Sequence, residues 1–387
     1  MDTPLRPVIL SESREAHRAL LASGAVIRTP LVRLNWSPAG AAADDAPEIW
    51  LKLECLQPTI GSFKVRGAGN AMASADPAAL ARHGVATASA GNMGQGVAAN
   101  ARLAGVRCTV VVPNGAPRTK VEAIERLGAT VVAVPFDEWW QIIQTGACPQ
   151  APPGAVFVHP VLDQAVLAGN STVALEILEQ LPDADVVLVP YGGGALACGI
   201  GSVVRALRPD GRCRVLACEP ATAAPCAQSF AQGECCAFER HAPSFVDGCG
   251  GKALLPPMWP IARAVLDGGL AVELEHIAAA IKVLVERNGI VAEGAGACPV
   301  AAAMVGQAAG CCPKRGKIVC VVSGRGLDTH KLIQILAGCP RAPFEKPTSA
   351  GCPATARSML GVGAVLALSA VASLAALAFS LRRKQQR

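Results

Sequence analysis

The sequence has few aromatic residues and few charged ones, and its cysteines lack metal-ligand spacing. Aromatic side chains make up 4% of the 387 residues and charged side chains 17%. The 35 basic residues are scattered, and no basic stripe carries interleaved aromatics. Nucleic acid is therefore not an expected partner despite the net charge of +6. Hydrophobic residues reach 51%, which excludes a disordered or fibrous chain and is enough for a sizeable core.

None of the 16 cysteines forms a C-x-x-C pair, and the six histidines do not cluster with them. Zinc sites and dithiol redox motifs need such spacing. The adjacent pairs Cys235–Cys236 and Cys311–Cys312 are of a kind that rarely forms simple bridges. Others, such as Cys108, Cys218 and Cys320, lie inside apolar runs. We interpret most of the cysteines as small buried hydrophobes in a reducing compartment.

The two ends of the chain differ in character. The N-terminal end carries charges throughout and does not resemble a secretory signal. Residues 358–381 form an uncharged apolar stretch, and about 20 such residues can cross a bilayer. They predict a C-terminal transmembrane helix, preceded by a Pro- and Ala-rich linker at 339–357 and followed by a basic tail at 382–387. We expect a membrane-anchored protein whose residues 1–338 face the cytosol.

From residue 85 onward, short β-branched runs alternate with amphipathic helical segments. The run at 108–113 precedes a helical pattern at 118–129, and the run at 185–190 precedes one at 196–209. This alternation predicts an α/β fold with parallel sheets covered on both faces. Such sheets bind ligands at the carboxyl ends of their strands, in the loops that open the next helix.

Three glycines, Gly192, Gly193 and Gly194, follow a predicted strand. They leave backbone N–H groups bare where a helix begins, and the helix dipole there favours an anion. The run predicts a phosphate site at Gly192–Ala195. It is neither a Walker loop nor a dinucleotide fingerprint, because no Gly-Lys-Ser/Thr and no ribose carboxylate follow. The alternative is a tight turn required for close packing.

Lys64 stands behind a Gly-Ser pair and ahead of a second glycine in PTIGSFKVRGAGNAM, residues 58–72, where a helix is expected to start. A ligand that carries a phosphate and also needs a lysine is a narrow class. Pyridoxal phosphate belongs to it, since it is held by a phosphate cup and by a Schiff base to a lysine amine.

The sequence resembles the serine/threonine dehydratase (threonine ammonia-lyase) and serine racemase family of fold-type II pyridoxal-phosphate enzymes. The similarity runs from about residue 28 to residue 328, with GSFKVRGA, SAGNMGQGVAANA, VLVPYGGGAL and VAEGAGA in the family's order. It implies a tryptophan synthase β-like fold, in which two doubly wound parallel-sheet domains hold the cofactor in the cleft between them. The smaller subdomain, about residues 67–165, would be inserted in the larger one. The family resemblance also suggests a homodimer.

The resemblance assigns roles to single residues. Lys64 would be the Schiff-base lysine and the base that removes the α-proton, and Phe63 would pack beside the cofactor ring. Asn92 would bond the ring oxygen, and Ser323 would face the pyridine nitrogen. The phosphate would be held by Gly192, Gly193, Gly194, Ala195 and Leu196. The substrate carboxylate would be bound by Ser89, Ala90, Gly91, Asn92 and Met93.

The implied reaction is the elimination of water from a hydroxy amino acid. A serine cannot keep the ring nitrogen protonated by charge, which makes the cofactor a weaker electron sink and suits elimination. L-threonine or L-serine would give a 2-oxo acid and ammonia, with a β-hydroxyaspartate as a third candidate substrate. Racemases of the family tend to have a second serine at the position of Ala90. Since racemisation needs an acid/base group on each face, alanine favours a dehydratase.

Other departures from the family pattern leave alternatives open. An extra residue near Ile60 and the alanine at Ala195 leave room for a membrane-tethered pyridoxal-phosphate-binding protein with little catalysis. In the family's metal-binding members a carboxylate stands six positions after the residue that matches Glu219, but here Pro225 does. We expect no divalent site, with Glu219 as the remaining candidate ligand. Glu293 either lies near the ring or caps the next helix. Arg325 is either a surface residue or a charge at the pocket edge.

Overall fold

The structure is a computed structural model that describes residues 5–37, 46–306, 310 and 315–338. The predicted linker, transmembrane helix and basic tail lie outside these residues. Within the described ranges, no helix is both long enough and apolar enough to cross a membrane.

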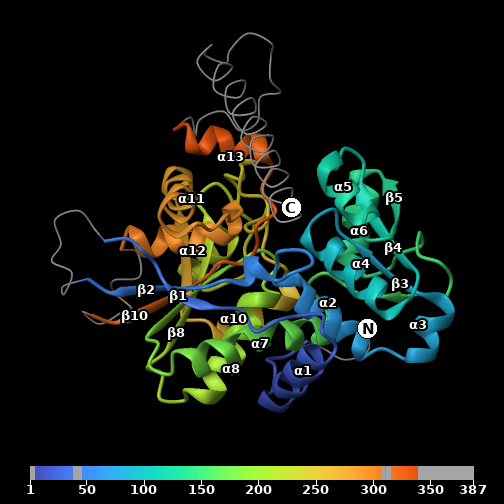
Figure 1. The fold of residues 1–387 in the computed structure, drawn as a ribbon, viewed down its shortest axis with the longest axis horizontal. Helices are drawn as coiled ribbons and strands as arrows, with labels where there is room; N and C mark the ends of the chain where they lie inside the picture. The colour runs from blue at the N-terminus through green and yellow to red at the C-terminus, as the bar shows by residue number, and fades with distance from the viewer. Residues whose placement is uncertain (1–4, 38–45, 307–309, 311–314, 339–387) are drawn as a thin grey trace, which may run out of the picture. The chain divides into compact units, whose positions relative to one another are not determined.

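Two sheets organise the described part of the chain (Figure 1). One has six strands in the order β1-β2-β10-β7-β8-β9, and the other has four in the order β5-β4-β3-β6. Every pairing is parallel except that between β1 and β2. The predicted α/β fold with parallel sheets is confirmed. The strands are β1 (Leu31–Arg33), β2 (Glu48–Lys52), β3 (Val85–Ala88), β4 (Cys108–Pro113), β5 (Thr130–Val134), β6 (Val156–Phe157), β7 (Val186–Pro190), β8 (Arg214–Pro220), β9 (Gly268–Val272) and β10 (Lys317–Val321).

Helices cover both faces of the six-stranded sheet, with α7 and α8 on one side and α11 and α12 on the other (Figure 1). The helices are α1 (Leu10–Ala22), α2 (Lys64–Ala73), α3 (Pro77–His83), α4 (Asn92–Ala104), α5 (Arg118–Glu125), α6 (Phe136–Thr145), α7 (Gln164–Gln180), α8 (Ala195–Leu207), α9 (Pro225–Gln232), α10 (Trp259–Val265), α11 (Leu274–Asn288), α12 (Gly294–Met304) and α13 (Thr329–Leu336), with 3-10 turns η1 (Glu54–Leu56) and η2 (Pro256–Met258).

The strand β7 shows why the sheet forms. Its Val187 and Val189 pack into the core that contains residues of α7 and α8, whereas Val186 and Leu188 pack into the core that contains residues of α11 and α12. Successive side chains of a strand point to opposite faces, so a strand buried on both sides must be apolar throughout. The sequence VVLVP meets that requirement, and all five residues are buried.

Most of the described cysteines are buried apolar side chains. Twelve are free, and nine of these are buried. Burial raises the pKa of Cys108 to about 12, so its thiol stays protonated at neutral pH. The interpretation of the cysteines as small buried hydrophobes is confirmed for this majority.

Three helices approach one another through glycines. A Cβ on Gly169 of α7 would lie 2.5 Å from the carbonyl oxygen of Arg66 in α2. A Cβ on Gly199 of α8 would lie 2.8 Å from the carbonyl oxygen of Leu167 in α7. Contacts this close leave no room for a side chain. The helix that begins at Lys64 is therefore held directly against α7.

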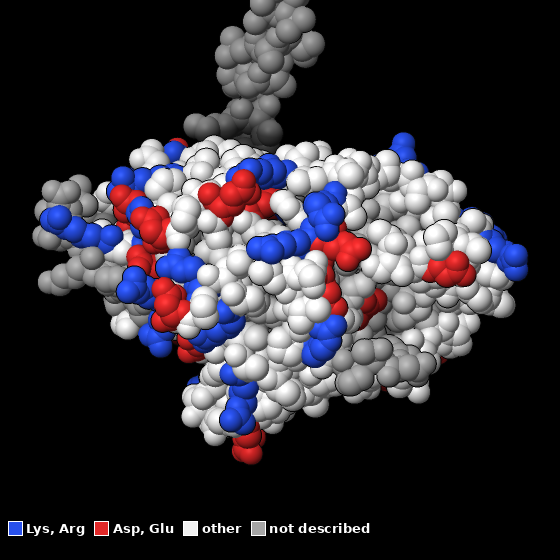
Figure 2. Space-filling view, turned by 90° about the horizontal axis from the view of Figure 1, so that it is seen from below, with Lys and Arg blue, Asp and Glu red and all other residues white. Residues whose placement is uncertain are grey.

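The charged side chains of the described surface are mixed in sign. On the face shown in Figure 2, basic and acidic side chains lie next to one another, and no large area carries a single sign. Mixed charges of this kind produce no extended field of one sign.

Replacing Gly169 by alanine is expected to lower the free energy of unfolding by about 1–3 kcal/mol, because its methyl group would overlap the Arg66 carbonyl. Chemical denaturation measures the change. Gly251→Ala is the matched control, since its Cβ would meet nothing closer than 3.7 Å. Equal losses in the two variants would contradict the packing argument.

Candidate active site

The turn before Lys64 is hydrogen-bonded to the loop that follows β10. The N–H of Phe63 donates to the carbonyl oxygen of Ser323 at 3.0 Å, and the N–H of Arg325 donates to that of Gly61 at 3.0 Å. Ser62 and Gly324 form an isolated antiparallel bridge between these bonds. The fold therefore brings Lys64 next to Ser323, as the arrangement of loops at one sheet edge predicts.

Lys64 is the first residue of α2 and is half-buried. Its Nζ lies 3.4 Å from the carbonyl oxygen of Pro160 and 5.2 Å from the centre of the Phe63 ring. Burial lowers the pKa of Lys64 to about 8, although the charge of Glu293 acts in the opposite direction. A substantial fraction of the amine is thus neutral near physiological pH, as a nucleophile or a base requires.

The glycine loop connects β7 to α8. Among the described residues, the N–H groups of Gly192, Gly193 and Gly194 have no hydrogen-bond acceptor. Gly194 adopts a positive φ of 97° and directly precedes α8. Ala195 and Leu196 are the first two residues of that helix. A helix start with bare N–H groups is a site for an anion.

Space around the loop is limited. A Cβ on Gly193 would lie 2.3 Å from Val161 Cγ2, and one on Gly194 would lie 2.6 Å from the hydroxyl of Tyr191. That hydroxyl is buried and has no hydrogen-bond partner among the described residues. The tight turn and the anion site are therefore compatible properties of the same loop.

The loop between β3 and α4 contains the residues expected to bind a substrate carboxylate. Ser89, Ala90 and Gly91 are partly exposed, whereas Met93 is buried. The Ser89 hydroxyl accepts a hydrogen bond from the Gly91 N–H at 3.2 Å. Asn92 begins α4 and turns its amide toward Glu293, with Nδ2 2.9 Å from Oε1.

The structure shows the surroundings of two residues for which the sequence left alternatives open. Glu293 occupies the N-cap position of α12 but makes no side-chain cap hydrogen bond; its carboxylate binds Asn92 and the N–H of Gly326 instead. Arg325 is exposed and lies over Gly61, since a Cβ there would be 2.3 Å from Arg325 Nε. It is a surface residue that covers the turn before Lys64.

Glu219 is buried at the end of β8. Its carboxylate accepts hydrogen bonds from the N–H groups of Cys226 and Ala227 at 3.2 and 2.9 Å. Burial raises the pKa of Glu219 to about 8, despite these two bonds. Within the described ranges, no three His, Cys, Asp or Glu side chains are arranged to hold a metal.

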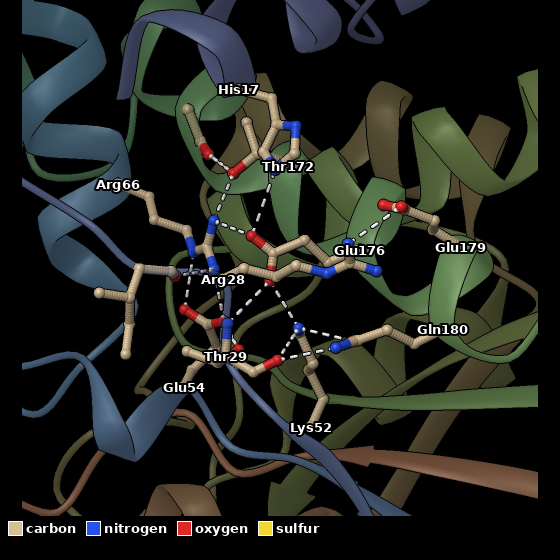
Figure 3. Close-up of polar contacts among 12 residues, drawn as sticks. His17, Arg28, Thr29, Lys52, Glu54, Arg66, Thr172, Glu176, Glu179 and Gln180 are labelled. Atoms are coloured by element: carbon tan, nitrogen blue, oxygen red, sulfur yellow. Dashed lines mark hydrogen bonds and ion pairs between the residues drawn. The ribbon is translucent and has the colours of Figure 1, made fainter. Parts of the chain in front are cut away.

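A buried ion-pair network lies at the far end of the first turn of α2 (Figure 3). Arg66 pairs with Glu54 at 2.8 Å and with Glu176 at 2.8 Å, and Lys52 pairs with Glu176 at 2.5 Å. All four side chains are fully buried. Their two positive and two negative charges balance, which buried charges require.

The network joins segments that are distant in the sequence. Thr29 donates its hydroxyl to Glu54 at 2.6 Å, and His17 of α1 lies 3.3 Å from Glu176. Because Arg66 follows Lys64 by two residues in the first turn of α2, its ion pairs fix the position of that turn. Sequence reasoning missed it. The signal was present as single charges within apolar runs, Lys52 in IWLKL and Glu176 in VALEIL.

The residues brought together fit pyridoxal phosphate. The glycine cradle leaves no room for a Cβ but offers bare N–H groups to a phosphate. Lys64 directly follows the residue that is hydrogen-bonded to Ser323, and its amine suits an aldehyde. An α/β protein with this combination has the features of an enzyme that uses this cofactor.

Comparison with known proteins identifies the family. Residues 22–324 match the family of pyridoxal-phosphate dependent enzymes, and the chain belongs to it. The chain is 41% identical to an L-threonine ammonia-lyase of Geobacter sulfurreducens, with 72% of this chain and 67% of that protein covered. It is 34% identical to a catabolic L-threonine dehydratase of Escherichia coli, with 85% and 96% covered. A serine racemase from Dictyostelium discoideum has a similar structure, with a TM-score of 0.70, 29% identity, and 83% and 99% covered.

Glu176→Gln is expected to lower the free energy of unfolding by about 3–5 kcal/mol, because it leaves Lys52 and Arg66 without a shared counter-charge. Glu122→Gln, which removes an exposed pair with Arg118, is the control and should cost at most about 1 kcal/mol.

The pH dependence of this loss follows from the pKa of Glu176. Burial raises it, but the His17 hydrogen bond and the charges of Arg66 and Lys52 outweigh burial and hold it below its ordinary value. The stabilisation is therefore complete above about pH 5 and disappears as the pH falls through the folded-state pKa. Denaturation measured from pH 8 down to pH 3 should show a constant difference in stability between the wild type and the variant above about pH 5 and a narrowing difference below it. A difference that vanished at neutral pH would refute the assignment.

Proposed function

We propose that the chain is a pyridoxal-phosphate-dependent ammonia-lyase that converts L-threonine, L-serine or both to a 2-oxo acid and ammonia. The observation that carries the proposal is the meeting of Lys64, whose amine is partly neutral at physiological pH, with the Ser323 loop, while a glycine loop offers a phosphate site. The names of the similar proteins, L-threonine ammonia-lyase and L-threonine dehydratase, support the same substrate class.

The proposed roles divide between holding and proton transfer. Gly192 to Leu196 would bind the phosphate, Ser323 would face the ring nitrogen, and Phe63 would pack beside the ring. The N–H groups of the loop from Ser89 to Met93 would bind the substrate carboxylate at the start of α4. The bound cofactor supplies an electron sink that makes the substrate Cα–H acidic.

Lys64 would then accept the α-proton at Nζ, which burial keeps partly deprotonated. The carbonyl oxygen of Pro160 holds that amine in one direction. Ala90 offers only a methyl group in the carboxylate-binding loop, so this position supplies no second base. The proposal therefore favours elimination over racemisation, and serine racemase is the alternative.

Lys64→Ala should reduce 2-oxo acid release at least about 10³-fold, because one side chain acts both as the covalent anchor and as the base. The assay would compare L-threonine, L-serine and β-hydroxyaspartate, and the best substrate would define the activity. Lys282→Ala, which removes an exposed lysine of α11, is the control and should retain full activity. Release that does not depend on Lys64 would refute the mechanism. D-serine formed without 2-oxo acid would instead establish a racemase.

We also propose that residues 358–381 anchor the protein in a membrane, with residues 1–338 on the cytosolic side, and that the catalytic part is a homodimer. The apolar, uncharged sequence of the segment supports the anchor, and the family resemblance supports the dimer.

Removal of all residues after Gly338 should move the protein from the membrane pellet to the soluble fraction and preserve its specific activity. Salt-washed fractions separate a true anchor from surface attraction, because salt screens charge but does not release a spanning helix. Sedimentation of the truncated protein should give twice the mass of one chain. A truncated protein that stayed in the washed pellet would rule out the anchor.

A further inference from the structure

Glu293 lies between the start of a helix that follows the four-stranded sheet and a loop that follows the six-stranded sheet. Its carboxylate accepts hydrogen bonds from Asn92 Nδ2, at 2.9 Å to Oε1 and 3.2 Å to Oε2, and from the N–H of Gly326 at 3.1 Å. Its own N–H donates to the carbonyl oxygen of Gly324 at 3.0 Å. Asn92 belongs to the helix after β3 of the four-stranded sheet, and Gly324 and Gly326 belong to the loop after β10 of the six-stranded sheet. The side chain is 6% exposed.

Glycines surround this carboxylate. A Cβ on Gly324 would lie 2.5 Å from Oε1, one on Gly326 would lie 3.0 Å from Oε2, and one on Gly248 would lie 3.2 Å from Oε1. The three positions leave no space for a larger residue without moving Glu293. The surrounding backbone is therefore packed against the carboxylate in one orientation.

The charged groups near the carboxylate come from both sides of the site. Lys120 of α5 pairs with Asp247 at 2.7 Å, and Asp247 directly precedes Gly248. Burial raises the pKa of Glu293, and Asp247 raises it further, whereas the Asn92 hydrogen bond, Lys120 and the Gly326 N–H lower it. The charge of Glu293 in turn raises the pKa of Lys64 against the effect of burial. Lys64 also lowers the pKa of His159, in which burial is the larger cause.

We propose that Glu293 is a positioning residue of the site: it fixes the amide of Asn92 and, through its bond to Gly324 opposite Ser62, places a negative charge beside the turn that precedes Lys64. An asparagine amide has two N–H donors. One N–H of the Asn92 amide donates to Glu293, which fixes the orientation of the side chain. The second N–H is then free to donate to another acceptor, such as the ring oxygen of a bound ligand. The proposal rests on the proposed cofactor site but not on the identity of the substrate.

The first experiment measures how fast the full chain, solubilised in detergent and stripped of cofactor, captures added pyridoxal phosphate between pH 6 and pH 10. Capture requires the neutral amine, so its rate should rise with pH through a midpoint near 8 in the wild type. Glu293→Gln removes the charge that raises this midpoint and should shift it downward by up to about 1 unit. The cofactor's own titration is common to all variants.

Glu286→Gln is the control for that shift, because it also removes one carboxylate, but from the exposed surface of α11, and does not act on Lys64. Its midpoint should equal that of the wild type. A Glu293→Gln midpoint equal to the wild type, or a control that shifts as much, would overturn the proposal. A wild type that captures no cofactor would overturn both this proposal and the proposed function.

The second experiment separates charge from reach. Glu293→Asp keeps the charge but is too short to hold Asn92, so its midpoint should stay near 8 while cofactor affinity falls about tenfold. This variant also decides the question if Glu293→Gln does not fold. Asn92→Ala should weaken affinity to a similar degree, and the double variant should be no weaker than the weaker single variant. Losses that multiply would show that Glu293 does not act through Asn92, and would overturn the proposal.

Discussion

Arg66 is a fully buried cation, and the position of Lys64 depends on its ion pairs. Arg66 stands two residues after Lys64 on the same helix, α2. It pairs with Glu54 of the η1 turn and with Glu176 of α7. An unpaired guanidinium at this depth would be strongly destabilising, so the helix cannot shift without breaking charged contacts. The close approach of α2 to Gly169 acts in the same direction. Charge and packing together leave one location for the start of α2.

Two opposing effects set the pKa of Lys64. Burial favours the neutral amine of Lys64, and Glu293 favours the charged form. Ser323, Phe63 and Lys64 are tied by backbone hydrogen bonds and sequence neighbourhood, whereas Asn92 reaches the site from the other sheet. Lys64 is thus positioned by the loop after β10, and Asn92, which lies at the start of α4, is held by the carboxylate of Glu293.

Local sequence signals predicted the parts of the fold that depend on neighbours along the chain. VVLVP is apolar throughout because β7 is buried on both faces. Gly194 directly precedes α8 because its positive φ of 97° favours glycine there. The family motifs pointed to Lys64, Asn92 and Ser323 through such local signals, since each stands in a short loop between a strand and a helix or at a helix start.

The sequence by itself determined the α/β class and the strand-to-helix loops. Only the tertiary structure decided which charges are buried and which pairs they form. Lys52, Glu54, Arg66 and Glu176 carry no local mark of their partners, because an ion pair between distant segments depends on the folded distance alone. The same holds for Glu293, whose position before α12 fits a helix cap equally well. Its contact with Asn92 exists because the starts of α4 and α12, 201 residues apart along the chain, lie side by side in the fold.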